Sequence, residues 1–148
     1  MSTDQTNELN SLKNLSEDLM LLFDEASSFF FADVVLKCES FSIPAHKSIL
    51  SARSPVFSAM FKTEMRESRD KSVDIDDMDI SVLRIMLMYI YTGNTDGLTM
   101  SNAHDLLFAA DKYQLIALKK ACSEYMKRNA EVQNIMKLLM LGDLYDRD

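Results

Sequence analysis

The sequence predicts a single α+β domain, with a few strands near its beginning and helices through most of the rest. Strand-like patterns fall mainly within residues 29–43, and from Ser48 onwards the apolar residues mostly recur at helical spacing. A chain of 148 residues suits one domain, and 3 Gly and 2 Pro leave little room for loops. With 47% hydrophobic and 26% charged residues, the composition is that of a globular protein.

The first part of the chain predicts one helix and a hairpin. Residues 1–14 are polar, so we expect a flexible lead-in. Leucines and a phenylalanine then recur at helical spacing over residues 15–23. Residues 29–38 are rich in aromatic and β-branched side chains and predict a strand. After a short polar break, residues 41–43 alternate and predict a second strand that completes the hairpin.

The middle of the chain predicts helices interrupted by one strand. A helical period begins at Ser48, and Ser54 followed by Pro55 is typical of a helix cap with proline at the first helical position. Residues 72–75 alternate and predict a third strand. Residues 80–91 are apolar nearly all round, which predicts a helix buried in the core.

Three helical patterns follow the turn chemistry of residues 92–97. They cover residues 106–113, 115–126 and 132–139, and their close spacing predicts short antiparallel helices. Gly142 weakens the last pattern by about 1 kcal/mol relative to alanine. We therefore place the domain at residues 15–142, and residues 143–148 form a tail or the start of a truncated helical extension.

Charge and cysteine content limit the partners and the compartment. The formal net charge of −7 argues against nucleic acid, because lysine and arginine supply most of that affinity. Cys38 and Cys122 are too few for a disulfide scaffold and indicate a reducing compartment. The first 14 residues lack the pattern of a signal peptide, and the longest apolar stretch is too short for a membrane span and contains Arg84. We expect a soluble protein of the nucleus or cytoplasm without nucleic acid or membrane partners.

The residues that could support catalysis or metal binding are sparse. Cys38, His46 and Asp33 could form a nucleophile, base and orienting acid, but nothing in the sequence shows that they converge. Cys38 is better explained as a small buried apolar side chain. Two cysteines and two histidines show no zinc spacing, and the aspartates of residues 74–79 lack the glycine and closing glutamate of a calcium loop. We expect no catalytic residue, no metal and no cofactor.

Two segments carry more apolar character than their surroundings. The helix at residues 15–23, together with residues 29–31, offers an apolar surface that either forms an interface or packs within the chain. Met65 lies alone inside the charged segment 62–68, either as a binding anchor or as an ordinary surface methionine. The residues alone favour an interaction module.

Four ordered segments together resemble the BTB/POZ domain. They are residues 33–36 (DVVL), 44–61 (PAHKSILSARSPVFSAMF), 88–93 (MYIYTG) and 109–113 (AADKY). The likeness covers residues 15–142, and within the family residues 52–68 look most like the speckle-type POZ protein group. Members of that group pair a substrate-binding MATH domain with the BTB domain.

The resemblance implies a helical cluster flanked by a short, mostly three-stranded sheet and a homodimer formed through the first helix. Asp33 and Lys47 match a buried charged pair near the dimer contact, and His46 becomes structural. The residues expected to face the partner chain are Leu15, Leu19, Leu22, Phe23 and Ile49.

The resemblance also implies a second surface, which binds the N-terminal domain of cullin-3. Adaptors of the family use a hydrophobic-x-Glu motif after the third helical segment, and Met65 and Glu67 match it. Asp111 and Tyr113 lie in the segment that completes the groove. The implied function is a non-catalytic dimeric adaptor that recruits substrates to a cullin-3 RING E3 ubiquitin ligase, with substrates bound by a domain not present in this chain.

Two alternatives stay open. The domain could be the homodimerisation module of a transcriptional regulator, although such POZ domains usually lack the hydrophobic-x-Glu motif. It could also be a short paralogue that competes with full-length adaptors, because no MATH domain precedes residue 15. A tetrameric channel domain and a small enzyme fit the motifs poorly.

Overall fold

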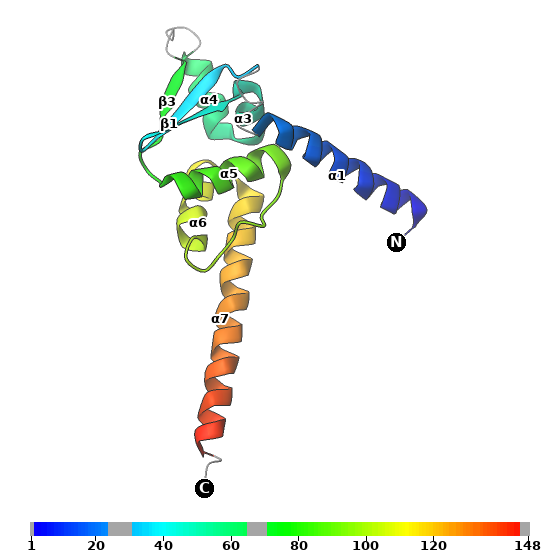
Figure 1. The fold of residues 1–148 in the computed structure, drawn as a ribbon, viewed down its shortest axis with the longest axis vertical. Helices are drawn as coiled ribbons and strands as arrows, with labels where there is room; N and C mark the ends of the chain where they lie inside the picture. Colours follow the sequence, from blue (N-terminus) through cyan, green and yellow to red (C-terminus); the bar gives the residue numbers. More distant parts are fainter. Residues whose placement is uncertain (1, 24–30, 65–70, 146–148) are drawn as a thin grey trace.

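The computed structural model describes residues 2–23, 31–64 and 71–145. A small sheet and a group of short helices form the body, from which two long helices project in different directions (Figure 1). The elements in chain order are α1 (Thr3–Phe23), β1 (Val34–Cys38), β2 (Phe41–Ala45), α3 (Lys47–Arg53), α4 (Pro55–Glu64), β3 (Ser72–Asp74), α5 (Ile80–Thr92), α6 (Ala103–Lys112) and α7 (Ile116–Tyr145).

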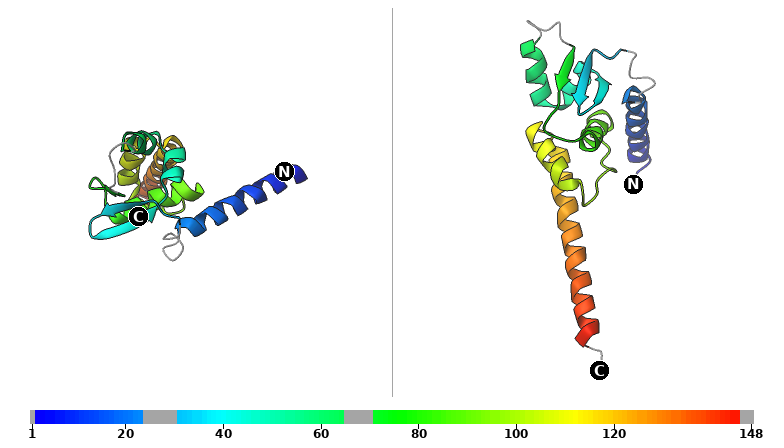
Figure 2. Two further views of the ribbon diagram at one scale, coloured as in Figure 1. Left: turned by 90° about the horizontal axis from the view of Figure 1, so that it is seen from above. Right: turned by 60° about the vertical axis from the view of Figure 1, so that its left-hand side comes forward.

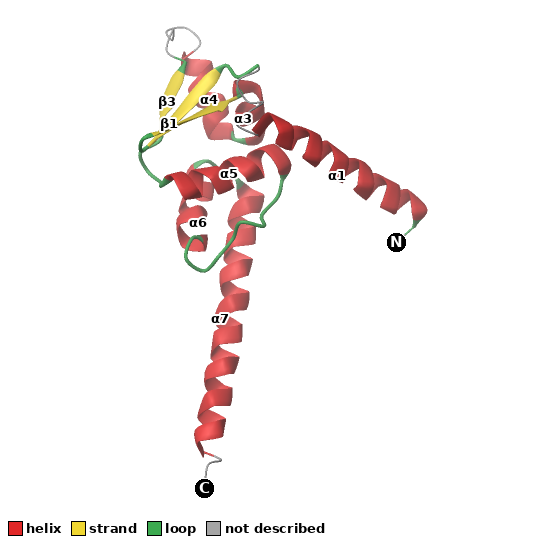
Figure 3. Cartoon of the chain, viewed as in Figure 1, coloured by secondary structure: helices red, strands yellow, loops and turns green. Residues whose placement is uncertain are grey.

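The sheet has three strands in the order β2-β1-β3 (Figure 3). Strands β1 and β2 form the predicted antiparallel hairpin, from the pair Val34–Ala45 to the pair Cys38–Phe41. Strand β3 runs parallel to β1, so α3 and α4 form the crossover that a parallel pair requires. Alternate residues of β1 are buried, which orients one face of the sheet towards the helices.

Helix α5 is the centre of the hydrophobic core, as its all-round apolar pattern predicts. Seven of its residues are buried. Asp79 caps its beginning by accepting a hydrogen bond from the Val82 backbone N–H at 2.9 Å. Gly93 ends it in the left-handed region at φ 76°, where its N–H donates to the Tyr89 carbonyl at 2.7 Å.

Helix α1 begins at Thr3, so the expected flexible lead-in over residues 1–14 is wrong for the described residues. Ser2 and Gln5 form a reciprocal capping box. The Ser2 N–H donates to Gln5 Oε1 at 3.0 Å, and the Gln5 N–H donates to Ser2 Oγ at 3.2 Å. These two hydrogen bonds give partners to the Ser2 and Gln5 backbone N–H groups, which have no acceptor within the first turn of the helix.

Helix α7 is continuous over 30 residues, so the two separate helices predicted for residues 115–126 and 132–139 are wrong. The segment between them contains neither glycine nor proline and is made mostly of residues that tolerate a helix. Beyond Asn129 the helix leaves the body, and its apolar side chains are exposed as far as they are described. Among the described helices, none combines the length and apolarity that a bilayer crossing needs.

Candidate functional site

An apolar groove of about 470 Å³ runs between α1, α3 and the end of α5. Helix α1 supplies one wall and α3 the other, and the last turn of α5 forms the floor. The groove is lined by Leu12, Leu15, Ser16, Leu19, Ser48, Ile49, Ala52, Arg53, Ile90, Tyr91, Thr92 and Gly93. Three of the five residues expected at a dimer contact, Leu15, Leu19 and Ile49, therefore line one groove.

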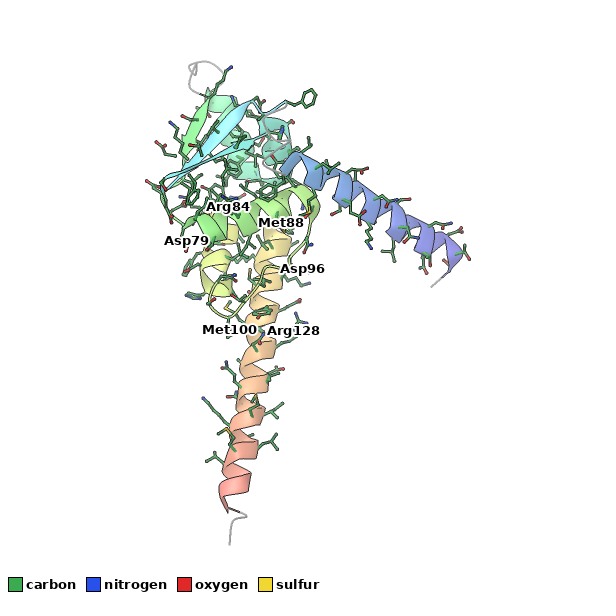
Figure 4. All side chains as sticks on the ribbon, in the orientation of Figure 1. Asp79, Arg84, Met88, Asp96, Met100 and Arg128 are labelled. Carbon is green, nitrogen blue, oxygen red and sulfur yellow. The ribbon has the colours of Figure 1, made fainter. Side chains whose placement is uncertain are left out.

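The contacts that hold helix α1 to the described part of the body come from Ser16, Leu22 and Phe23 in its C-terminal half. Phe23 packs against Tyr91 with ring centroids 5.7 Å apart, and Ser16 Oγ donates to the Thr92 carbonyl at 2.7 Å. Leu22 also packs against the core, whereas Leu15 is 54% exposed. No residue of α1 is buried, and its N-terminal half projects from the body with side chains on all sides of the helix (Figure 4). The helix therefore presents an apolar face that its own chain leaves uncovered.

The groove floor rests on a buried pair of side chains, His46 and Tyr91. The Tyr91 hydroxyl accepts the His46 backbone N–H at 3.0 Å and lies 2.8 Å from His46 Nδ1. Burial raises the pKa of Tyr91 to about 12. His46 thus fixes the junction between β2 and α3, in agreement with a structural role.

Asp33 and Lys47 are brought together, but they do not form the expected buried ion pair in the single chain. Asp33 is exposed and Lys47 is half-buried. Asp33 Oδ1 accepts the Lys47 backbone N–H at 2.8 Å at the start of α3, and the Lys47 ammonium lies 5.6 Å from the Phe61 ring centroid. The Asp33 carboxylate thus bonds to a backbone N–H of the first turn of α3 that has no partner within the helix. The Lys47 side chain is directed to the Phe61 ring instead of to that carboxylate.

Of the four residues expected to bind cullin-3, two lie outside the described residues, namely Met65 and Glu67. The third, Asp111, is exposed in the last turn of α6. Its Oδ1 accepts a hydrogen bond from Lys119 Nζ at 2.7 Å across to α7. Asp111 is therefore at the surface, as an interface residue must be.

The fourth, Tyr113, is 3% exposed in the single chain, so little of its side chain is accessible, and its contact with cullin-3 stays a prediction. Its ring stacks on Phe57 with centroids 4.7 Å apart, and its carbonyl accepts Ser54 Oγ at 2.7 Å. Burial, followed by the charges of Asp77 and Asp76, raises the pKa of Tyr113 to about 12. Tyr113 fastens the end of α6 to the start of α4.

The imagined triad of Cys38, His46 and Asp33 does not come together. Cys38 pairs with Phe41 at one end of the hairpin, whereas Asp33 and His46 lie beyond the other end. Four residue steps along a strand separate the ends by about 13 Å. Burial raises the pKa of the Cys38 thiol, so it is a poor nucleophile.

The aspartates between β3 and α5 have structural partners. Asp79 caps α5, and Asp77 forms an ion pair with Lys112 of α6. Among the described residues, no group of three or more histidines, cysteines or carboxylates is arranged to hold a metal ion.

Two residues that line the groove were not identified from the sequence. Leu12 lines the groove but falls in the segment expected to be flexible. Its position three residues before Leu15 could have indicated that it shares a helical face with that residue. Arg53 lines the same groove, and its Nε donates to the Ile90 carbonyl at 3.0 Å. Nothing in the sequence pattern indicates that contact.

Comparison with known families and proteins gives one consistent result. The model of the BTB/POZ domain family matches residues 22–130. The chain is 42% identical over 131 residues to TD and POZ domain-containing protein 3 of Mus musculus. That match takes in 88% of this chain but 35% of the relative, so the chain spans about a third of the relative's length.

Two solved structures share the fold. The BTB domain of zebrafish PATZ1 superposes with a TM-score of 0.65 at 23% identity, covering 86% of this chain and 98% of that one. The BTB (Tramtrack and Bric a brac) domain of human Gigaxonin gives a TM-score of 0.60 at 25% identity, covering 84% and 95%. These likenesses confirm the helix-rich α+β fold with its small three-stranded sheet.

Proposed function

Because the chain belongs to the BTB/POZ domain family of protein-interaction modules, we propose that it is a homodimeric adaptor for a cullin-3 RING E3 ubiquitin ligase. BTB domains generally dimerise and bind partner proteins. The adaptor is non-catalytic. It contributes proximity between a bound substrate and the enzymes that the ligase recruits, and a dimer doubles the number of attachment points.

The observation that carries the homodimer is the uncovered apolar face of α1 beside the groove. Leu12 and Leu15 are each 54% exposed, and Leu9 is 49% exposed on the same helix. An apolar stripe of this kind costs free energy in water, and a second copy of the same surface covers it symmetrically.

The cullin surface is supported by the order of residues at the end of α4. The hydrophobic-x-Glu motif, Met65 and Glu67, directly follows Glu64, the last residue of that helix. The Ser54–Tyr113 hydrogen bond ties α4 to the end of α6, which carries the exposed Asp111. An apolar anchor with a carboxylate at its rim is a common arrangement at protein interfaces.

Substrate selection belongs, on this proposal, to a domain outside this chain. The chain spans 35% of its mouse relative, so most of that relative lies outside the match. Cys38 and Cys122 are free and buried, which agrees with a place in the reducing nucleus or cytoplasm.

The deciding experiment is titration calorimetry of the domain against the N-terminal domain of cullin-3 at physiological salt. We expect binding in the submicromolar range at one cullin per protomer. Met65→Asp places a charge at the apolar anchor and is expected to weaken binding at least 100-fold, a loss of about 2.7 kcal/mol or more, without changing the dimer.

Thr63→Asp is the matched control, because Thr63 is exposed two positions before the anchor and is not part of the motif. A folded dimer that does not bind cullin-3 would contradict the adaptor. It would leave the two alternatives, a dimerisation module of a transcriptional regulator or a competitor of full-length adaptors. Binding that Met65→Asp leaves unchanged would remove the motif from the proposal.

A further inference from the structure

The groove-lining ridge of α1 continues towards the N-terminus as two carboxylates. Leu12, Leu15 and Leu19 line the groove at spacings of three and four residues. Glu8 and Asp4 extend the same ridge by two further steps of four. One ridge of α1 is therefore apolar where it meets the body and acidic where it projects.

The acidic end of this ridge lies away from its own body. At 1.5 Å per residue, Asp4 lies about 12 Å beyond Leu12 along the helix axis. The N-terminal end of α1 points away from α3, α4 and the sheet in each view (Figures 1 and 2). In the described part of the chain, neither Asp4 nor Glu8 forms an ion pair.

A second pocket, of about 390 Å³, lies on the other side of α3 and meets the groove at Ser48. Its charged groups are Lys47, Lys62 and Asp33, and the Asp33 carboxylate already accepts the Lys47 backbone N–H. The remaining lining is three serines and Phe61. The pocket therefore carries a local positive charge in a chain whose net charge is −7.

The symmetry of a homodimer brings these two features together. In a two-fold contact, each α1 presents the same face to its partner. If the two helices ran parallel, Asp4 and Glu8 would face the same carboxylates of the partner, which is unfavourable. If they run antiparallel, the N-terminal half of one helix lies beside the C-terminal half of the other, next to the partner's α3 and its pocket.

We propose that the acidic arm of α1, Asp4 and Glu8, docks onto the Lys47–Lys62 pocket of a second copy of this chain. This inference rests on the proposed homodimer and assigns its orientation. The apolar part of the ridge provides most of the affinity, because exposed ion pairs contribute little. The carboxylates and lysines select the antiparallel register and make the dimer sensitive to salt.

A charge-swap experiment on the 148-residue chain tests the arm. Glu8→Lys is expected to weaken the dimer about fivefold at low salt, measured as the dissociation constant by analytical ultracentrifugation. Adding Lys62→Glu to the same chain should restore most of the affinity. Glu17→Lys is the matched control: it makes the same change on the opposite face of α1 and should have less effect.

A cross-link gives a second, geometric measurement. Equal amounts of a Glu8→Cys chain and a Lys62→Cys chain are mixed and oxidised, and we expect a disulfide between the two chains. A Glu17→Cys chain in place of the Glu8→Cys chain should form much less of this disulfide, since position 17 faces away from the groove. The native cysteines, Cys38 and Cys122, are buried and do not compete.

The outcomes separate this inference from the proposed function. A stable dimer in which Glu8→Lys acts no more strongly than Glu17→Lys, or is not rescued by Lys62→Glu, overturns the docked arm and leaves the homodimer standing. A wild-type chain that stays monomeric at micromolar concentration overturns both.

Discussion

Ser54 joins two helices that are far apart in the sequence. Its Oγ accepts the Phe57 N–H at 3.3 Å at the start of α4 and donates to the Tyr113 carbonyl at 2.7 Å. The side chain is fully buried. The serine-proline pair predicted the cap, but not the second hydrogen bond, because that contact spans 59 positions of the chain.

We expect Ser54→Ala to lower the free energy of unfolding by about 1–3 kcal/mol, because it removes a cap and leaves a buried carbonyl unsatisfied. Urea denaturation followed by circular dichroism measures the loss. Thr63→Ala is the control, since the Thr63 hydroxyl bonds to Ala59 within its own exposed helical turn. A Ser54→Ala change no larger than the control would show that the link between α4 and α6 is not a stabilising contact.

Tyr91 and Tyr113 both have a pKa raised to about 12 by burial, yet they differ in what their hydroxyls do. The Tyr91 hydroxyl accepts from the His46 backbone N–H, whereas the Tyr113 hydroxyl has no hydrogen-bond partner among the residues that the structure describes. We expect Tyr91→Phe to cost about 1–3 kcal/mol at pH 7 and Tyr113→Phe to be close to neutral. Urea denaturation of the two variants at that pH distinguishes them.

The same two tyrosines predict loss of stability in alkali. The folded state holds their protons up to about pH 12, while the unfolded chain releases them from about pH 10. Their contribution is therefore complete below pH 10 and falls as pH rises from 10 to 12, by about 1.4 kcal/mol per pH unit for each tyrosine. Tyr113→Phe should halve the tyrosine part of that slope, and an unchanged slope would contradict its burial.

At the scale of elements, α1 is the helix that the proposed dimer contact would cover. Leu15→Asp together with Leu19→Asp places two charges in the groove wall, and we expect the dimer to weaken at least about 100-fold. Leu22 is less suitable for this test, because it packs against the core of its own chain. Sedimentation equilibrium over a concentration series measures the change.

The control for α1 is Leu21→Asp together with Met20→Asp. Both side chains are exposed, at 61% and 40%, and neither lines the groove. These substitutions make the same chemical change on another face of the same helix. If they weaken the dimer as much as the groove substitutions, the contact does not lie where the groove is.

The sequence predicted the type of nearly every element but misjudged the extent of two helices. The amphipathic spacing in residues 15–23 was visible, whereas the start of α1 depends on Ser2 and Gln5, a capping pair inside a segment that is polar throughout. The break expected within α7 came from a gap in its apolar pattern. The backbone continues through that gap because no residue there prevents it.

At the scale of the whole molecule, the distal half of α7 adds length without adding to the core. The described side chains from Lys127 onwards are exposed apart from Asn129, including Val132, Ile135 and Leu139. We expect deletion of residues 131–148 to change the free energy of unfolding by less than about 1 kcal/mol. The helical circular dichroism signal should fall in proportion to the residues removed.

A longer deletion, of residues 120–148, is the comparison for that experiment. It removes Cys122, which is fully buried against the core. Because this leaves a cavity, we expect the free energy of unfolding to fall several times more than for the first deletion, or the chain not to fold. Should the shorter deletion unfold the chain as well, the projecting helix would have a stabilising role that its exposure does not reveal.

The candidate surfaces could be predicted only as far as local pattern reaches. Leu15, Leu19 and Ile49 were expected at one interface and do line one groove. Tyr113 was expected in the segment that completes the cullin groove, and the pattern did not show that its ring is buried on Phe57 of another helix. The sequence pattern alone did not assign the residues whose role depends on contacts with distant parts of the chain.

The order of the strands also affects how readily the sheet could misassemble. Strand β1 is central, so β2 and β3 are the edges at which an unwanted strand could add. β3 offers three residues, and β2 contains Pro44, which has no N–H to donate. Both edges are therefore poor templates for strand addition and amyloid-like growth. The proposed homodimer can then form through the helices while the sheet stays closed to aggregation.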